Sequence, residues 1–122
     1  MTQTTALLII DHGSRRRAAN HLLFELVKLV RTMRPNLLVY GAHMELAEPT
    51  IEDGIKWCIE KGATHIIGHP YMLSPGRHAT EDIPRMMGEI MKNHPGISYD
   101  VTDPLGVDSK LVELILHRAG LE

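Results

Sequence analysis

The order and spacing of the apolar residues predict an α/β fold, a three-layer sandwich around a mostly parallel four-stranded sheet. Short apolar runs typical of buried strands alternate four times with longer segments whose apolar residues recur at helical spacing. Such alternation favours right-handed crossovers and helices on both faces of the sheet, as in flavodoxin-like and Rossmann-like domains. A length of 122 residues is typical of one domain, so we expect residues 1–122 to form a single unit.

The first strand and the first helix are predicted from the change of periodicity after residue 10. The run ALLII (6–10) is continuous and apolar, as in a buried parallel strand, and Asp11 and Gly13 end it. A helical stripe follows and ends before Pro35. The members of this stripe are Leu22, Leu23, Leu26, Val27, Val30 and Met33.

The second strand and helix show clear boundary signals. An apolar run at 37–42 predicts the strand. Thr50 is a typical N-cap, and Glu52 and Asp53 in the first turn complement the positive end of the helix dipole. Lys61 and Gly62 are a typical helix stop.

Two further strand–helix units complete the chain. THIIGH (64–69) predicts the third strand, and the helix after it finishes by Pro95. A weaker strand is expected at 97–102 and a last helix at 108–119. The apolar residues of the third helix are Ile83, Met86, Met87, Ile90 and Met91.

Charge and composition exclude several classes of protein. A net charge of −2 argues against nucleic acid as a main partner, because neutralising phosphates requires a basic excess. No stretch approaches the roughly 18 apolar residues of a membrane span, and the N-terminus lacks the basic start of a secretory signal. The single cysteine, Cys58, lies on the apolar face of a predicted helix and excludes an internal disulfide framework. We therefore expect a buried thiol and a cytoplasmic protein.

Histidine is the compositional outlier, with eight residues in the chain. In an open α/β sheet, ligands bind beyond the carboxyl ends of the strands, where the strand-to-helix loops converge. Four histidines are expected at that edge: His12, His43, His69 and His78. The others are expected on helices, at helix ends or at the opposite rim of the sheet: His21, His65, His94 and His117.

The four histidines at this edge do not carry equal weight. His43 and His69 end buried strands, which favours core histidines bonded to a backbone carbonyl. His12 lies in the glycine-containing turn DHGSR, and His78 follows Pro-Gly and Arg77, so a function is favoured for these two. Two neutral imidazoles at adjacent strand ends would bind Co²⁺, Ni²⁺, Fe²⁺ or Zn²⁺ and leave coordination positions open.

Several polar residues near this pair can be interpreted in more than one way. Glu45 and Glu48 in MELAEP (44–49) can add a carboxylate ligand, accept a proton or remain exposed loop acids. Ser14 lacks the GxSxG elbow of a nucleophile, so we expect it to cap the first helix, and we expect Thr80 or Asp82 to cap the third. GxGxxG, GxxxxGK[ST], CxxC and HExxH are absent, which argues against a nucleotide loop or a closed zinc site.

Four blocks of sequence, spread along nearly the whole chain, carry a resemblance to a known family. They are DHGSR (11–15), MELAEPTI (44–51), HPYMLSPGRHATEDIP (69–84) and DPLGVDSKLVELILHR (103–118), and Asn20 follows the first one. In this order they resemble the small class II chelatases, the CbiX and SirB group, which insert a divalent metal into sirohydrochlorin.

The resemblance implies that His12 and His78 are the metal-binding and catalytic pair of a chelatase-type domain. It also implies that a chain of this length is the short form, which acts as a homodimer, whereas larger members fuse two such units. Two departures affect the ligand set. DHGSR stands where many members have GHGSR, and GHPY adds His69 at the end of the third strand, so His69 is a candidate third metal ligand.

The implied reaction needs no organic cofactor and no ATP, because the divalent metal is itself a substrate: Co²⁺ first, alternatively Fe²⁺ or Ni²⁺. Sirohydrochlorin is a flat macrocycle rimmed by carboxylates, and Glu45 or a neutral histidine is expected to accept its pyrrole protons. The residues expected to bind the rim are Arg15, Arg16, Arg17, Arg77 and Ser14. One alternative is a non-catalytic cobalt or nickel carrier, or a tetrapyrrole-binding module, that uses the same histidines. Another is a histidine phosphohydrolase, for which a second anion-clamping motif is missing.

Overall fold

A computed structural model describes residues 3–122, so Met1 and Thr2 of the predicted 1–122 domain lie outside the described residues. Strands and helices alternate along the chain as the sequence predicts. The strands are β1 (Thr5–Asp11), β2 (Leu38–His43), β3 (His65–Pro70) and β4 (Ser98–Val101). The helices are α1 (Arg17–Met33), α2 (Ile51–Glu60), α3 (Ile83–Met91) and α4 (Ser109–Ala119), and a π-helical turn, η1 (His78–Asp82), precedes α3.

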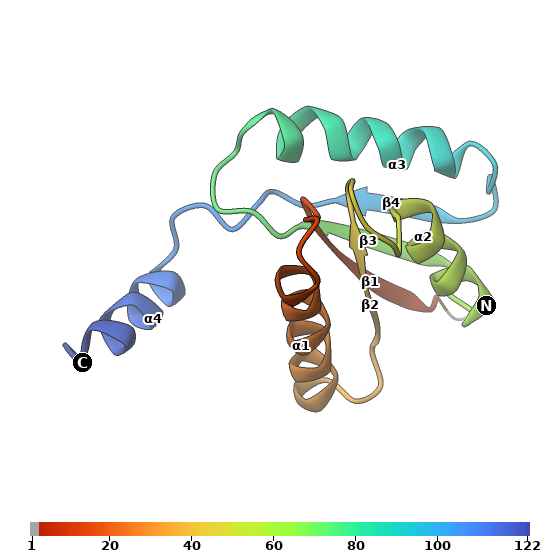
Figure 1. The fold of residues 1–122 in the computed structure, drawn as a ribbon. Helices are drawn as coiled ribbons and strands as arrows, with labels where there is room; N and C mark the ends of the chain where they lie inside the picture. The colour runs from red at the N-terminus through yellow and green to blue at the C-terminus, as the bar shows by residue number, and fades with distance from the viewer. Residues whose placement is uncertain (1–2) are drawn as a thin grey trace.

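The four strands form one parallel sheet in the order β2-β1-β3-β4. The central strand β1 pairs Asp11 with His43 of β2 and Ile10 with Pro70 of β3. Helix α1 covers one face of the sheet, and α2 and α3 cover the other (Figure 1). The predicted α/β class with a parallel four-stranded sheet is therefore confirmed, and all four carboxyl ends lie along one edge.

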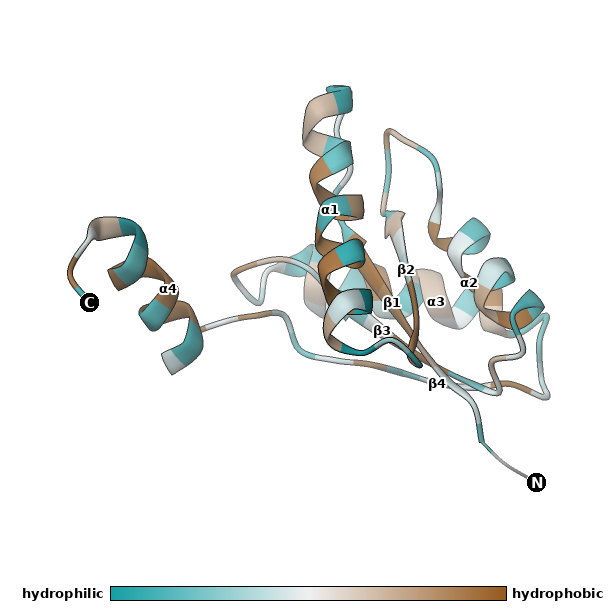
Figure 2. Ribbon diagram, turned by 90° about the horizontal axis from the view of Figure 1, so that it is seen from below, coloured by the Kyte–Doolittle hydropathy of each residue, from teal (hydrophilic) through white to brown (hydrophobic). Residues whose placement is uncertain are grey.

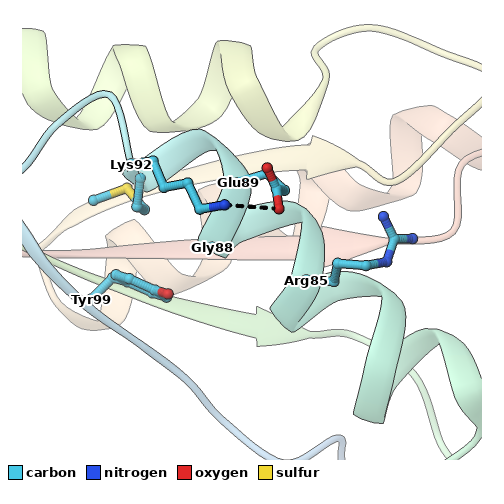
Figure 3. A pocket seen from close by; sticks show the side chains of 6 residues that line it. Arg85, Gly88, Glu89, Lys92 and Tyr99 are labelled. Carbon is cyan, nitrogen blue, oxygen red and sulfur yellow. Dashed lines mark hydrogen bonds and ion pairs between the residues drawn. The ribbon is translucent and has the colours of Figure 1, made fainter.

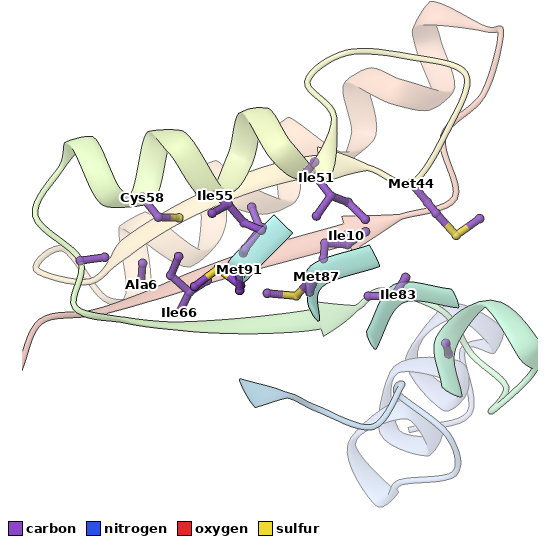
Figure 4. Packing of buried hydrophobic residues seen from close by; sticks show 14 of the residues in the cluster. Ala6, Ile10, Met44, Ile51, Ile55, Cys58, Ile66, Ile83, Met87 and Met91 are labelled. Atoms are coloured by element: carbon purple, nitrogen blue, oxygen red, sulfur yellow. The ribbon is translucent and has the colours of Figure 1, made fainter. Parts of the chain in front are cut away.

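Two apolar clusters hold these layers together. The larger cluster lies between the sheet and helices α2 and α3, and Figure 4 shows its isoleucine and methionine side chains meeting there. Cys58 belongs to it, and burial raises the pKa of its thiol to about 12, so the predicted core role is confirmed. The smaller cluster lies under α1 and contains Ile9, Leu23, Val27 and Val39.

The second helix begins as predicted. Thr50 Oγ1 accepts the backbone N–H of Asp53 at 3.1 Å, and the Asp53 carboxylate accepts the N–H of Thr50 at 3.0 Å. This reciprocal capping box satisfies two backbone donors that a helix start would otherwise leave unpaired. It also fixes the end of the loop that returns from β2.

The starts of α1 and α3 differ from the prediction. Ser14 does not cap α1: its Oγ accepts the N–H of Arg16 at 3.0 Å, two residues on, and Arg16 occupies the N-cap position without a side-chain bond. Neither Thr80 nor Asp82 caps α3, because η1 already runs helically from His78 into α3. The helical conformation therefore begins at His78. This residue is held near the carboxyl ends of the strands by a helical turn and not by an irregular loop.

Helix α4 stands apart from the sandwich. It buries none of its residues, and Figures 1 and 2 show it at a distance from the sheet, joined by the segment after β4. Asp108 caps its start by accepting the N–H of Lys110 at 2.8 Å. Within residues 3–122, none of the helices combines the length and apolar character that a membrane crossing demands.

Candidate metal centre

The structure brings His12 and His78 together. His12 follows β1 directly, and His78 opens η1 after the loop that leaves β3. Because β1 and β3 are neighbours in the sheet, their carboxyl ends deliver the two residues to the same place. The ring centres lie 4.9 Å apart with an interplanar angle of 89°.

This geometry suits one shared ion. Two imidazoles that bind one ion at about 2.1 Å from each nitrogen have ring centres about 5 Å apart. Both rings are exposed, so an ion can reach them from solvent. Among residues 3–122, no three His, Cys, Asp or Glu side chains converge to hold a metal. His12 and His78 could therefore supply two ligands to an ion and would leave its other coordination positions open.

Asp82 orients His78. Its Oδ2 lies 2.8 Å from His78 Nδ1, one helical turn along η1, so a proton on Nδ1 is held there and Nε2 is left for a ligand. The hydrogen bond from His78 lowers the pKa of the Asp82 carboxyl below its usual range, and Arg85 at 3.6 Å acts in the same direction. Sequence reasoning assigned Asp82 to a cap and missed this role, although the four-residue spacing in HATED carries the signal.

Two hollows of about 320 Å³ each meet at His12. One lies beside α1 and is lined by Asp11, His12, Gly13, Ser14, Ala19, Asn20, Leu22, Leu23 and Tyr71. The other lies beside the loop after β3 and is lined by His12, Met72, Leu73, Ser74, Gly76, Arg77, His78 and Ala79. The two-histidine site is thus the centre of a wider open surface.

The predicted cationic residues are distributed unequally around this surface. Arg77 lines the hollow of His78, and its Nε lies 3.6 Å from Glu81 in an exposed pair. Arg15, Arg16 and Arg17 are exposed at the start of α1 but line neither hollow. A ligand larger than one hollow is needed to contact both groups of arginines.

Glu45 approaches His12 through its backbone. Its N–H donates to the His12 carbonyl at 3.0 Å, and Gly13, at φ +89°, leaves room for the Glu45 carbonyl where a Cβ would overlap it. The Glu45 side chain is exposed and lines neither hollow, and Glu48 is also exposed. The loop is therefore fixed beside the site, and the Glu45 side chain is exposed next to it.

His43 is a core histidine, as its strand-end position favours. Its imidazole is fully buried, with Nδ1 2.6 Å from Asp11 Oδ1 and the ring edge-on to Phe24 at 5.9 Å. The bonding partner is thus a carboxylate rather than the expected backbone carbonyl. Its Nε2 has no hydrogen-bond partner within the part of the chain that the structure describes.

His69 does not join the pair. Its Nδ1 lies 2.8 Å from Thr102 Oγ1, and burial lowers its pKa below the usual value. No described group of three potential ligands contains it. The strand alternation explains this, because His69 pairs in register with Ile9 and points to the face of the sheet that carries α1.

A separate hollow of about 450 Å³ lies between α3 and β4 (Figure 3). Its polar side chains include Arg85, Glu89, Lys92 and Tyr99, and Lys92 Nζ already pairs with Glu89 at 3.2 Å. No histidine is among its lining residues, so it is distinct from the candidate metal centre.

Known proteins match this chain along nearly its whole length. The family model CbiX matches residues 6–120. The chain is 42% identical to the sirohydrochlorin ferrochelatase, chloroplastic, of Arabidopsis thaliana, over 92% of this chain and 50% of that protein. It is 34% identical to the sirohydrochlorin cobaltochelatase of Methanocaldococcus jannaschii, over 93% of this chain and 96% of that protein.

Solved structures with a similar fold also come from chelatases and CbiX proteins. The sirohydrochlorin chelatase SirB from Bacillus subtilis subspecies spizizenii, in complex with cobalt, matches with a TM-score of 0.89 and 30% identity, over 97% of this chain and 50% of that one. A CbiX protein from Marinobacter aquaeolei VT8 matches with a TM-score of 0.80 at 23% identity, which shows the fold alone. The chain spans about half the length of several relatives it matches and nearly the whole length of others.

Proposed function

The chain belongs to the CbiX family, and from that premise we propose that it inserts a divalent metal ion into sirohydrochlorin, with Co²⁺ as the first candidate and Fe²⁺ or Ni²⁺ as alternatives. The relatives named as cobaltochelatases and ferrochelatases support both of the first two metals. The observation that carries the proposal is the His12–His78 pair, exposed at the carboxyl ends of adjacent strands.

His12 and His78 hold the incoming ion in this proposal. Their 4.9 Å ring separation supports a shared ion, and the open positions let pyrrole nitrogens replace water on the metal. Asp82 acts on His78 Nδ1 at 2.8 Å and keeps Nε2 aimed at the ion. A weak site suits this task, because a closed four-ligand site would retain the metal.

The macrocycle binds over the two hollows that meet at His12. Its rim carboxylates are recognised by Arg77 on one side and by Arg15 and Arg16 before α1 on the other. Ser14 lines the hollow beside α1 and so contacts the macrocycle, while its Oγ accepts the N–H of Arg16. This placement uses residues of both hollows at once.

Insertion releases two protons. The two pyrrole N–H bonds break, their electron pairs bind the metal, and nothing is oxidised or reduced. The exposed Glu45 carboxylate is the proposed first acceptor, since the Glu45 backbone is fixed beside His12 and its side chain is open to solvent. A histidine freed from the metal is the second.

The test is metal insertion followed by the visible spectrum of sirohydrochlorin with Co²⁺, Fe²⁺ or Ni²⁺. We expect His12→Ala and His78→Ala each to slow insertion at least about 100-fold. His21→Ala is the matched control, because His21 is exposed on α1 and pairs with Glu25 at 3.0 Å, away from both hollows. Equal rates in all variants would overturn the assignment, and metal uptake without any spectral change would favour the carrier alternative.

We further propose that residues 1–122 act as one chelatase unit and that two such units work as a homodimer. The relatives support this pairing, because the family contains chains of about this length and chains of about twice this length. Sedimentation of the purified protein tests it: the mass of one chain is 13.7 kDa, and the proposal expects twice that mass.

A further inference from the structure

The carboxylate of Asp11 has one oxygen engaged inside the protein and one open to the hollow beside α1. Oδ1 lies 2.6 Å from His43 Nδ1, which is the hydrogen bond that Asp11 makes within residues 3–122. Oδ2 is not enclosed, because the one buried side-chain atom without a partner in this part of the chain is His43 Nε2. The Asp11 side chain is 21% exposed and lines the hollow that meets His12.

His43 determines which oxygen of Asp11 is left open. A proton on His43 Nε2 would be a buried donor without an acceptor, so the proton is held on Nδ1 and donated to Asp11 Oδ1. The ring is fully buried and packs edge-on against Phe24 at 5.9 Å, which fixes the direction of this bond. Asp11 Oδ2 therefore faces the hollow as an acceptor that its own chain leaves free.

The neighbouring polar groups of this hollow are already engaged. Asn20 Oδ1 accepts the N–H of Ser14 at 2.9 Å, and Asn20 Nδ2 donates to the Ser14 carbonyl at 2.7 Å. Ser14 Oγ accepts the N–H of Arg16 at 3.0 Å. These bonds hold the turn after β1 in place, so the hollow presents Asp11 Oδ2 from a fixed frame.

A free carboxylate oxygen in this hollow suits one kind of group on sirohydrochlorin. The rim carboxylates are ionised at neutral pH, so they accept hydrogen bonds and are repelled by Asp11. The donors that remain are the pyrrole N–H groups at the centre of the macrocycle. That centre has to lie over the ion held by His12 and His78, and Asp11 directly precedes His12 in the chain.

We propose that Asp11 Oδ2 accepts a hydrogen bond from a pyrrole N–H of the bound macrocycle, and that this bond makes the site select metal-free sirohydrochlorin over the metallated product. His43 is the positioning residue for Asp11. This inference rests on the proposed function and names the residue that distinguishes its substrate from its product. The bond leaves the proton on the pyrrole nitrogen, so Glu45 remains the proposed first proton acceptor.

The selection follows from the change in the macrocycle during insertion. Both pyrrole N–H groups are present before the metal enters, and neither is present afterwards. A site built to bind an N–H discriminates against an analogue that lacks it, because its own polar group is then left without a partner. The Asp11 carboxylate thus favours release of the product. A glycine at this position, as in GHGSR, has no side chain to do this.

Equilibrium dialysis of two macrocycles tests the inference. Wild type and Asp11→Asn are dialysed against metal-free sirohydrochlorin and, separately, against chemically prepared cobalt sirohydrochlorin, and the bound macrocycle is measured by its visible absorbance. In Asp11→Asn the amide oxygen has to accept the His43 N–H, so the NH₂ group faces the hollow and offers a donor. We expect the preference for the metal-free macrocycle to fall at least about 10-fold.

The ratio of the two affinities is the informative quantity. Loss of a negative charge changes the repulsion of both macrocycles alike, because their rims carry the same carboxylates. Asp100→Asn is the matched control, since Asp100 is 75% exposed on β4 and lines neither hollow. We expect this control to keep the wild-type ratio. An equal ratio in wild type and Asp11→Asn, or an equal fall in the control, overturns the inference.

A second substitution keeps the test independent of how Asp11→Asn folds. Asp11→Ser retains an oxygen near His43 but is too short to reach into the hollow, so we expect the same fall in the ratio. If Asp11→Ser keeps the wild-type ratio, the inference is wrong.

Two substitutions of His43 test its positioning role. His43→Asn keeps an N–H donor near the position of Nδ1, and we expect it to keep most of the preference for the metal-free macrocycle. His43→Leu has a similar size without a donor, and we expect it to lose that preference. A purely structural role for His43 predicts the same ratio in both variants.

These binding measurements separate the inference from the proposed function. A wild type that inserts metal but shows the same ratio as Asp11→Asn would overturn the role of Asp11 alone. A wild type that binds neither macrocycle would overturn both.

Discussion

Two histidine–aspartate pairs lie at the same edge of the sheet, and they differ in what surrounds the second imidazole nitrogen. His43 Nδ1 lies 2.6 Å from Asp11, and the His43 side chain is 0% exposed. His78 Nδ1 lies 2.8 Å from Asp82, and the His78 side chain is 46% exposed beside His12. A carboxylate orients the ring in both pairs, but only the exposed pair leaves a nitrogen that an ion can reach.

The comparison teaches that pairing with an aspartate does not by itself mark a metal ligand. The buried pair joins β1 to β2 under α1, and Asp11 directly precedes His12 in the chain. The role of this pair is therefore to hold the edge of the sheet. The exposed pair sits on a helical turn at the mouth of a hollow, so in the proposed function its role is to present a ligand. Stability should depend on the first pair and metal affinity on the second.

Removal of the buried ring should have the largest effect on stability. His43→Ala leaves a cavity under α1 and an aspartate without its partner, so we expect the free energy of unfolding to fall by about 3 kcal/mol. Urea unfolding measures it, with His21→Ala as an exposed control expected to change stability by less than about 0.5 kcal/mol. If the free energy of unfolding fell by the same small amount in both variants, the buried pair would not have the structural role assigned to it.

Removal of the exposed carboxylate should act on affinity instead. Asp82→Asn keeps the size of the side chain but weakens its hold on His78 Nδ1, so we expect Co²⁺ affinity to fall about 10- to 100-fold. Titration calorimetry measures the affinity, and Glu89→Gln on α3 is the matched control. If Asp82→Asn kept its Co²⁺ affinity but lost much of its free energy of unfolding, the exposed pair would have a structural role, contrary to the comparison.

His69 extends the comparison to a histidine whose partner is a hydroxyl. Burial lowers the pKa of His69, so the unfolded chain takes up a proton at a higher pH than the folded one. Its contribution to stability is therefore present above pH 6.5, the ordinary imidazole value, and is lost as pH falls through 6.5 toward the lowered pKa.

His69→Gln should remove this part of the pH dependence. The free energy of unfolding, measured at several pH values on both sides of 6.5, is expected to decline less on the acid side in the variant than in the wild type. Identical slopes in the two proteins would mean that His69 titrates alike in the folded and unfolded chains.

Much of the fold follows from local sequence signals. The run at 6–10 and the stripe up to Met33 predict β1 and α1, and Thr50 marks the start of α2, because these signals act within a few residues. The start of α1 at Arg17 was not predicted, because Ser14 bonds to Arg16 in a turn instead of capping the helix. The position of α4 away from the sheet was not predicted either. The segment before it is held by two hydrogen bonds to the loop after β3, from the N–H groups of Leu105 and Gly106 to the carbonyls of Met72 and Leu73, and such long-range contacts leave no local signal.

The candidate site was predictable to a similar degree. His12 and His78 follow from strand order, because the carboxyl ends of adjacent parallel strands converge. The orienting role of Asp82 was missed, because the four-residue spacing from His78 to Asp82 brings the two side chains together only once the helical turn His78–Asp82 is known to form. His69 was a candidate third ligand as well as a candidate core histidine, and the alternation of side chains along β3 directs it to the α1 face and to Thr102.

The central claim is that His12 and His78 bind one ion together, and a double-mutant cycle in Co²⁺ binding tests it most directly. His12→Ala, His78→Ala and the double variant are titrated with Co²⁺ at neutral pH, with His21→Ala as the control. If the two rings share an ion, either single substitution removes most of the affinity, and the double variant loses little more than each single one. Losses in binding free energy that simply add, or affinity that survives either single substitution, would contradict a shared site.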